Sequence, residues 1–381
     1  MAYFDNNSTT RPLLEVLQAV QSASEISWAN PSSPHRQGIR VRALMEKARE
    51  EIAQSLAVEP KTLTFTSGAT ESNNAILSSL AKDGSEPGKS ILVSAIEHPS
   101  ILETAHHCYG GNVRLIPVNS DGVVEMEDFK KLMDLELPGL VSLMAVHNET
   151  GVLQPWQEVA DFCKDRGVWF HCDATQWMGK LDHCGFHSCS SFSFSAHKFG
   201  GPKGVGVLVS SEPVSWIKGG GQEAEKRGGT ENFPGIEGMR VAWKHQCIPS
   251  SDYGKLEDWR NNFEQSLFTQ IPGLKVIGHK ALRLWNTSLL CLPDFENVQW
   301  VSKLDKLGFS VSTGSACSTA REHPSTLAGA IGLSKAEGRR LVRVSSYSDT
   351  TEQDWLNLAN AFVDALLELE SERQNAGVIT L

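Results

Sequence analysis

Short apolar segments alternate with longer segments of helical periodicity from the N-terminal part of the chain to near residue 245. Each apolar segment is a few residues long and rich in β-branched or aromatic residues, which predicts a buried strand. Such strands are predicted at 63–66, 90–94, 113–117, 140–146, 168–171 and 205–209. Helices are predicted between them, for example at 72–81, 100–107 and 156–166. This order predicts an α/β fold with a mostly parallel central sheet flanked by helices.

The pattern changes after a polar, proline-containing connector at 248–253. A helix is predicted at 255–271, and short strands are predicted at 274–277, 287–292, 310–312 and 342–345. The last segment has helical periodicity from Trp355 onward, with Thr350 as the predicted N-cap and Gln353 three residues later. These elements predict a smaller α+β domain at the C-terminal end.

Length and composition agree with two globular domains. At 381 residues the chain exceeds the usual size of one compact domain, and its 40% hydrophobic and 21% charged residues are ordinary for a globular protein. We expect a large domain over 16–245 and a small domain that combines 1–15 with 246–381.

The net charge of −10 and the absence of a long basic run argue against direct nucleic-acid binding. No stretch approaches 18 apolar residues, so no membrane span is expected. The first residues lack a secretory pattern, and the eight cysteines are then interpreted as reduced thiols. We expect a cytoplasmic protein.

The segment from Thr66 to Asn74 is a candidate phosphate site. A predicted strand ends, a turn of small residues follows, and a helix begins. Free N–H groups at a helix N-terminus bind anions, Gly68 permits close backbone approach, and the Thr70 hydroxyl adds a donor. An ordinary capped turn explains the same residues, so this segment alone leaves both interpretations open.

Asp173 and Lys198 each follow a predicted strand. Ligands of parallel sheets bind beyond the carboxyl ends of the strands. Lys198 comes shortly after the alternating segment 191–195, which predicts a strand with one apolar face. A lysine there can form a Schiff base with pyridoxal 5'-phosphate (PLP), and a carboxylate can pair with the pyridinium nitrogen. A surface lysine and a helix-capping aspartate are the alternatives. The order of phosphate turn, Asp and Lys along the chain favours the PLP interpretation.

These residues belong to a set of seven motifs that resembles the class V aminotransferase group of the fold type I PLP-dependent enzymes, and within it the cysteine desulfurases. The resemblance extends from Phe4 to Ser345. The motifs are Ser67-Gly68-Ala69-Thr70-Glu71-Ser72-Asn73, Glu97-His98-Pro99-Ser100, Asn148-Glu149-Thr150-Gly151, Asp173-Ala174-Thr175-Gln176, Ser195-Ala196-His197-Lys198, Arg227-Gly228-Gly229-Thr230-Glu231-Asn232 and Thr313-Gly314-Ser315-Ala316-Cys317-Ser318.

The resemblance implies a role for each catalytic or ring-binding residue. Lys198 would hold the cofactor and shuttle protons, and Asp173 would pair with the pyridine nitrogen. Gln176 would hydrogen-bond the ring hydroxyl. His98 would stack on the ring and act as an acid–base group, for which its ordinary pKa is suitable; a capping role before Pro99 is the alternative.

The remaining implied roles concern the phosphate and the substrate. Ala69, Thr70, Ser195 and His197 would line the phosphate, and Thr230 would reach the phosphate of the neighbouring subunit, which implies a homodimer. Asn148 would contact both cofactor and substrate. Arg343 would bind the substrate carboxylate, because its fork donates two parallel hydrogen bonds, unless it is a solvated strand residue.

Cys317 distinguishes the desulfurase interpretation from a plain aminotransferase. It lies among small residues between a strand and a helix, where a loop can present a reactive thiol; an incidental loop cysteine is the alternative. The resemblance implies conversion of L-cysteine to L-alanine, with the sulfur carried on Cys317 as a persulfide. The sulfur would pass to an acceptor protein for iron–sulfur cluster, thio-cofactor or tRNA biosynthesis.

Three alternatives remain at this stage. A selenocysteine lyase or another class V aminotransferase or lyase would use the same scaffold, and a non-catalytic sulfur-trafficking protein would keep the fold without activity. His183, Cys184, His187 and Cys189 could be drawn as a metal cluster, but they lack the paired spacing of structural zinc sites. We therefore predict no metal site.

Overall fold

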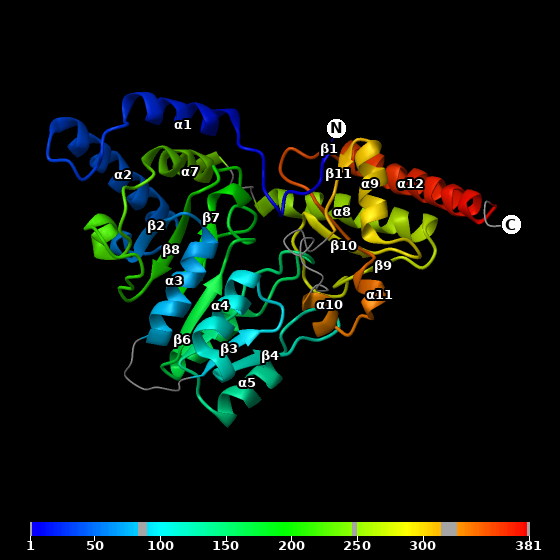
Figure 1. Cartoon of the computed structure of the whole chain (residues 1–381), viewed down its shortest axis with the longest axis horizontal. Helices are drawn as coiled ribbons and strands as arrows, with labels where there is room; N and C mark the ends of the chain where they lie inside the picture. Colours follow the sequence, from blue (N-terminus) through cyan, green and yellow to red (C-terminus); the bar gives the residue numbers. More distant parts are fainter. Residues whose placement is uncertain (1, 83–89, 246–249, 314–325, 379–381) are drawn as a thin grey trace.

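The computed structural model describes residues 2–82, 90–245, 250–313 and 326–378, which form two groups of elements side by side (Figure 1). The first group is built on a seven-stranded sheet in the order β2-β8-β7-β6-β5-β3-β4. Its strands are β2 (Leu63–Thr66), β3 (Ile91–Ser94), β4 (Val113–Ile116), β5 (Leu140–Ser142), β6 (Trp169–Asp173), β7 (Ser191–Ser195) and β8 (Gly206–Ser210). Of these seven strands, β8 alone runs against its two neighbours, which confirms the predicted, mostly parallel sheet.

Helices cover both faces of this sheet. They are α1 (Leu14–Ile26), α2 (Arg36–Ser55), α3 (Ala69–Lys82), α4 (Pro99–Tyr109), α5 (Met126–Leu135), α6 (Trp156–Asp165) and α7 (Phe233–His245). Successive side chains of a strand point to opposite faces, and in β3 Leu92 joins one core cluster while Ile91 and Val93 join another. The cluster around Ile91 contains residues of α3 and α4, and the cluster around Leu92 contains residues of α2, α5, α6 and α7.

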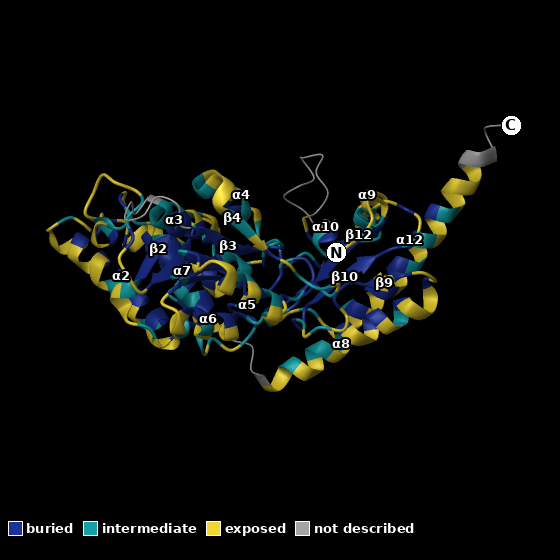
Figure 2. Cartoon of the chain, turned by 90° about the horizontal axis from the view of Figure 1, so that it is seen from below, coloured by how far each residue is buried: buried dark blue, intermediate teal, exposed yellow. Residues whose placement is uncertain are grey.

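The second group contains an antiparallel three-stranded sheet of β12 (Leu341–Ser345), β10 (Thr287–Cys291) and β9 (Lys275–Val276). Its helices are α8 (Ser250–Gln270), α9 (Asn297–Lys306), α10 (Thr326–Ala330), α11 (Lys335–Gly338) and α12 (Glu352–Val378). Figure 2 shows buried strands here, with long exposed surfaces on α8 and α12. Among the described helices, none combines the length and apolar character that crossing a membrane requires.

The first residues of the chain pack with the second group. Strand β1 (Ala2–Tyr3) pairs in parallel with β11 (Phe309–Ser310), and the Phe4 ring lies 5.0 Å from the ring of Trp355. These contacts support the proposed small domain of 1–15 with 246–381. Because α1 begins at Leu14, the proposed boundary to the large domain falls at the start of that helix.

The N-cap of α12 differs from the prediction by one residue. The hydroxyl of Thr351 accepts a hydrogen bond from the Asp354 N–H, and the Asp354 carboxylate accepts one from the Thr351 N–H. Thr350 instead accepts a hydrogen bond from the Tyr347 N–H. An acidic residue three positions after a threonine makes the same reciprocal cap as glutamine does, so the sequence contained two overlapping capping signals.

A strained turn gives a testable prediction about stability. Glu223, Ala224 and Glu225 have φ angles of 48°, 55° and 65°, although none is glycine. The left-handed conformation costs a non-glycine residue about 1–2 kcal/mol, and Glu225 is exposed. We therefore expect Glu225→Gly to raise the free energy of unfolding by about 0.5–1 kcal/mol, after the added entropy of the unfolded chain is subtracted. Urea unfolding measures the change. Glu212→Gly is the control, and equal destabilisation by both changes would contradict the prediction.

Candidate active site

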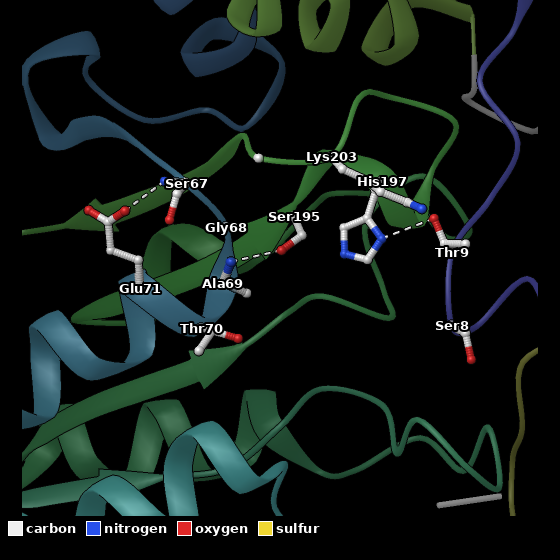
Figure 3. A pocket seen from close by; sticks show the side chains of 11 residues that line it. Ser8, Thr9, Ser67, Gly68, Ala69, Thr70, Glu71, Ser195, His197 and Lys203 are labelled. Carbon is white, nitrogen blue, oxygen red and sulfur yellow. Dashed lines mark hydrogen bonds between the residues drawn. The ribbon is translucent and has the colours of Figure 1, made fainter. Parts of the chain in front are cut away.

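An open pocket of about 440 Å³ lies beyond the carboxyl ends of β2 and β7 (Figure 3). This is the edge at which open parallel sheets bind their ligands. The lining residues come from the N-terminal segment, the start of α3 and the loop after β7. They are Ser8, Thr9, Ser67, Gly68, Ala69, Thr70, Glu71, Ser195, His197, Lys203 and Gly204. All four residues predicted to line a phosphate are in this set.

The turn before α3 is held close to the end of β7. The Ala69 N–H donates to Ser195 Oγ over 2.7 Å, as Figure 3 shows. A Cβ on Gly206 would lie 2.6 Å from the Cα of Gly68, so only glycine lets β8 approach this turn. The pocket thus combines a helix N-terminus with hydroxyl groups and the ammonium group of Lys203, a set of donors that suits a phosphate monoester.

His197 in this pocket is neutral at physiological pH. Burial lowers its pKa to about 4, and the nearby ammonium groups of Lys198, Lys203 and Lys180 act in the same direction. Its Nδ1 lies 3.2 Å from the Thr9 hydroxyl (Figure 3). A neutral imidazole with one nitrogen at Thr9 keeps its other nitrogen for a further hydrogen bond.

The serine face of β7 is turned toward the site. The alternation of Ser and Phe predicted one apolar face, but all five residues of β7 are buried. Ser191 Oγ lies 2.9 Å from His171 Nδ1, and Ser195 accepts the hydrogen bond from Ala69 described above. A strand inside a sheet covered on both faces has no solvent-exposed face, so its polar side chains pair with one another or with a ligand.

The Asp173 carboxylate is oriented by two donors at the end of β6. Its Oδ2 accepts from Asn73 Nδ2 over 2.8 Å, and its Oδ1 accepts from the Thr175 N–H over 3.0 Å. Asn73 Nδ2 also donates to Ser100 Oγ over 2.9 Å. Asn73 on α3 therefore connects Asp173 to the start of α4, where His98 lies.

His98 is the N-cap of α4, as the alternative interpretation expected. Its Nδ1 accepts from the Ser100 N–H over 3.1 Å, so the proton of the neutral ring is on Nε2. Burial lowers the pKa of His98, although Asp173 acts to raise it, and Lys198 lowers it further. The cap fixes one edge of the ring and leaves Nε2 for chemistry, so the two interpretations are compatible.

Lys198 and Gln176 meet at the N-terminal segment. The Lys198 ammonium donates to the carbonyl oxygens of Asn7 and Ser8 over 2.7 and 2.8 Å. Gln176 Nε2 donates to the same Asn7 carbonyl over 3.0 Å. The strand-end lysine is therefore partly buried, because a segment nearly 200 positions earlier in the chain packs against it.

Arg343 lies beside Asn148, the other residue predicted to bind substrate. One terminal nitrogen donates to the Asn148 carbonyl over 3.1 Å, and the other donates to the Asp5 carboxylate and the Ser8 hydroxyl, each over 2.6 Å. Within the described residues, its buried Nε has no hydrogen-bond acceptor. A buried guanidinium N–H without a protein acceptor is suited to an anionic ligand.

The class-V aminotransferase family model matches residues 2–358. The chain belongs to this family. It is 34% identical to the cysteine desulfurase IscS of Dictyoglomus turgidum over 376 residues, which are 96% of this chain and 94% of that protein. It is 35% identical to the cysteine desulfurase of Cereibacter sphaeroides, over 96% of this chain and 94% of that one.

Solved structures agree with these sequence relatives. A NifS-like protein superposes with a TM-score of 0.88 at 34% identity, covering 96% of this chain and 99% of that one. The NifS-like protein from Rickettsia africae superposes with a TM-score of 0.86 at 29% identity, covering 96% and 99%. The relatives confirm the resemblance to the cysteine desulfurases and do not favour the selenocysteine lyase alternative.

Enzymes of the class-V aminotransferase family use PLP, and the residues of this site fit that group. The pocket donors suit its phosphate, and Asp173 and Lys198 suit its ring nitrogen and aldehyde. In the turn after β6, the buried Thr175 Oγ1 has no partner among the described residues. A polar atom left without a partner at the edge of this family's cofactor site agrees with a ligand of many acceptor atoms.

One predicted residue lies apart from this geometry, and another falls outside the described residues. Thr230 is exposed and is not among the lining residues of the pocket. Cys317 falls in 314–325, outside the described residues. The prediction also missed Asp5, Asn7 and Asn73, which hold the predicted residues in place. Asn73 lies in one of the seven motifs, and Asp5 and Asn7 lie at the start of the segment over which the resemblance extends, so their positions were the available signal.

His147 gives a prediction about acid stability. Its Nδ1 accepts from the Thr150 N–H over 3.2 Å, and burial, with Arg343 and His98 nearby, lowers its pKa to about 3. The unfolded chain takes up this proton near pH 6.5, so the free energy of unfolding falls as the pH drops from 6.5 toward 3. Asparagine keeps an acceptor near Thr150 without titrating. Between pH 7.5 and 5, we expect the free energy of unfolding to fall by about 2 kcal/mol less in the His147→Asn variant than in the unchanged protein.

Urea unfolding at several pH values tests this expectation. His187→Asn is the control, because His187 is exposed. Parallel stability profiles of the His147→Asn variant and the unchanged protein would show that His147 does not carry the acid sensitivity.

Proposed function

We propose that this class-V family member is a PLP-dependent cysteine desulfurase that converts L-cysteine to L-alanine and takes up the sulfur on Cys317. The observation that carries the proposal is the environment of Arg343. A buried guanidinium, whose Nε–H has no acceptor among the described residues, lies beside Asn148, and the same N-terminal segment that contacts it also contacts Lys198. An amino-acid carboxylate held at Arg343 therefore lies close to an amine that can move protons.

The cofactor would be held at three places. Ala69, Thr70, Ser195 and His197 would bind its phosphate, Asp173 would pair with its ring nitrogen, and Gln176 would donate to its ring oxygen. When bound, PLP supplies an aldehyde that takes up amines and a ring that stores electron density. The two hydrogen bonds donated to Asp173 keep that carboxylate directed along the end of β6.

The protein side chains would then bind the substrate and move its protons. Arg343 and Asn148 bind the end of the cysteine that carries its carboxylate and amine. Lys198 Nζ, placed by the carbonyls of Asn7 and Ser8, takes the proton from Cα. His98 Nε2 acts as the second acid–base group, since its Nδ1 is occupied by the cap of α4.

Cys317 would act as the nucleophile toward sulfur. Its thiolate attacks the sulfur of the substrate, a sulfur–sulfur bond forms, and the bond between that sulfur and Cβ breaks. The electron pair of the broken bond stays with the carbon skeleton, which takes up a proton and leaves as alanine. The persulfide on Cys317 then passes its outer sulfur to an acceptor thiol, and we propose a cytoplasmic acceptor protein for this step.

Exposed apolar side chains support the proposed homodimer. Leu14, Leu17 and Trp28 in and after α1 are 65%, 53% and 69% exposed. Apolar groups gathered on one element of a surface favour association. In a dimer, Thr230 of each subunit would reach the phosphate of the other. The native mass in solution tests this proposal, and a monomer at micromolar concentration would contradict it.

The proposed reaction is tested by treating the purified protein with L-cysteine and measuring two products together. We expect free alanine in solution and one added sulfur atom on the peptide that contains Cys317, located by mass spectrometry. Selenocysteine and amino acids without sulfur serve as competing substrates in parallel samples. A keto acid in place of alanine would identify an aminotransferase, and alanine from selenocysteine alone would identify a selenocysteine lyase.

A further inference from the structure

Lys180 is a fully buried lysine to which the proposed reaction gives no task. It closes the turn that follows β6, and its exposed fraction is 0%. Lysine is almost never fully buried unless it is paired with an opposite charge. Among the described residues, the charged groups that act on Lys180 are Lys198 and Arg343, both of which are cations. A buried amine among cations costs stability, so its retention at this position needs a local reason.

The partners of Lys180 are two side-chain amides of the site. Its Nζ donates to Asn7 Oδ1 over 3.1 Å and to Gln176 Oε1. An ammonium group offers donors only, so both amides must turn their oxygen atoms toward it. The Gln176 NH2 group is consequently directed away from Lys180, to the Asn7 carbonyl that also accepts from Lys198.

The orientation of the Gln176 amide matters because its two ends are nearly equal in shape and opposite in hydrogen bonding. With its NH2 group toward Lys198, Gln176 donates to an anionic oxygen placed there. With the amide turned over, it would present an oxygen atom and repel that anion. Asn7 is held in the same way, since Asn286 donates to its Oδ1 and its Nδ2 donates to Thr287.

We propose that Lys180 is a positioning residue that keeps the Gln176 amide turned with its NH2 group toward the ring oxygen of the cofactor. This inference rests on the proposed function. Burial, with Lys198 and Arg343 nearby, lowers the pKa of Lys180 well below its ordinary value, but a neutral amine still has two N–H groups, one for each of the two amide oxygens. Lys180 also acts on His197, whose pKa it helps to lower.

The proposal is tested on the PLP-loaded protein with Lys180→Met, Gln176→Ala and the double variant. Methionine matches the lysine side chain in length and tolerates burial. One measurement is the dissociation constant of PLP. The other is the pH midpoint of the visible absorbance of the link between PLP and Lys198, without substrate. Lys164→Met, a change of an exposed lysine on α6, is the control.

We expect Lys180→Met and Gln176→Ala each to weaken PLP binding about tenfold, the effect of one hydrogen bond to a charged group. Each variant should also raise the pH midpoint, because the lost donor stabilised the ring anion that remains after the link is deprotonated. The double variant should bind PLP no more weakly than either single variant, since the two residues act through one contact. A merely structural role of Lys180 would not depend on Gln176.

The proposal would be overturned if Lys180→Met left PLP binding and the pH midpoint of the absorbance unchanged. It would also be overturned if the losses of PLP affinity in the two single variants multiplied in the double variant. Should Lys180→Met fail to fold, Lys180→Arg keeps a donor-only group, and a folded Lys180→Arg protein with tenfold weaker PLP binding would overturn it equally. The absence of any visible band in the unchanged protein would instead contradict the proposed function.

Discussion

We expect the Lys198→Ala variant to lose at least about 10³-fold in the rate of alanine formation from cysteine, within the range that a positioned acid–base group contributes. Lys198 has two tasks in the proposed reaction, since it tethers the cofactor and takes the Cα proton. Its Nζ is placed for both by the carbonyls of Asn7 and Ser8. Alanine can be measured by chromatography, and covalent attachment of PLP by borohydride reduction followed by mass mapping.

The matched control for this change is Lys218→Ala, which removes an exposed lysine whose ammonium contacts Ser215. We expect it to keep the activity and the borohydride-trapped label at Lys198. If Lys198→Ala retained both the visible band and most of the turnover, another amine would have to hold the cofactor. Lys180 would then be the candidate, because it contacts the same residue, Asn7.

The Cys317→Ala variant is expected to lose sulfur transfer entirely and at least about 10²-fold in alanine formation, because no thiolate is then supplied to accept the sulfur when its bond to Cβ breaks. Binding of cysteine should persist, since Arg343 and Asn148 are unchanged, so the spectrum of the loaded protein should still respond to the substrate. Turnover, the spectral response and the sulfur carried per chain are measured on the same preparation.

Cys184→Ala is the matched control, because Cys184 is the exposed free cysteine of the described residues. It should form alanine at an unchanged rate and carry the added sulfur on Cys317. Equal turnover of the Cys317→Ala and unchanged proteins would remove this thiol from the mechanism. Equal losses in the Cys317→Ala and Cys184→Ala proteins would show instead that the assay reports a general need for thiols.

Most strands of the large sheet were predictable because they are short apolar segments bounded by turn residues. The predicted strand at 63–66 coincides with β2, and the one at 205–209 lies within one residue of β8. The direction of each strand and its neighbours in the sheet were harder to predict from the sequence. Nothing local distinguishes β8, which is antiparallel to its neighbours, from the parallel strands β3 and β5, because all three are short, buried and mostly apolar.

The phosphate pocket was predictable for a related reason. Ala69 and Thr70 begin a helix two residues after a strand, Ser195 ends another strand and His197 follows it, so the shared edge of one sheet brings them together. The capping pair of α12 was displaced by one residue, since Thr350 and Thr351 both have a suitable residue three positions later. The sequence alone cannot decide between two capping signals of equal strength, because the packing around them selects the one that is used.

The amino-acid sequence by itself determined the family, the α/β class and the order of the chemical groups, because those depend on residue types and on spacing within a few positions. The tertiary structure alone decided what holds these groups in place. Asn7 contacts Asn148, Gln176, Lys180, Lys198 and Thr287, which are 141 to 280 positions away. Hydrogen bonds across such separations arise when the chain is compact, since they depend on the path of the whole backbone rather than on any local pattern.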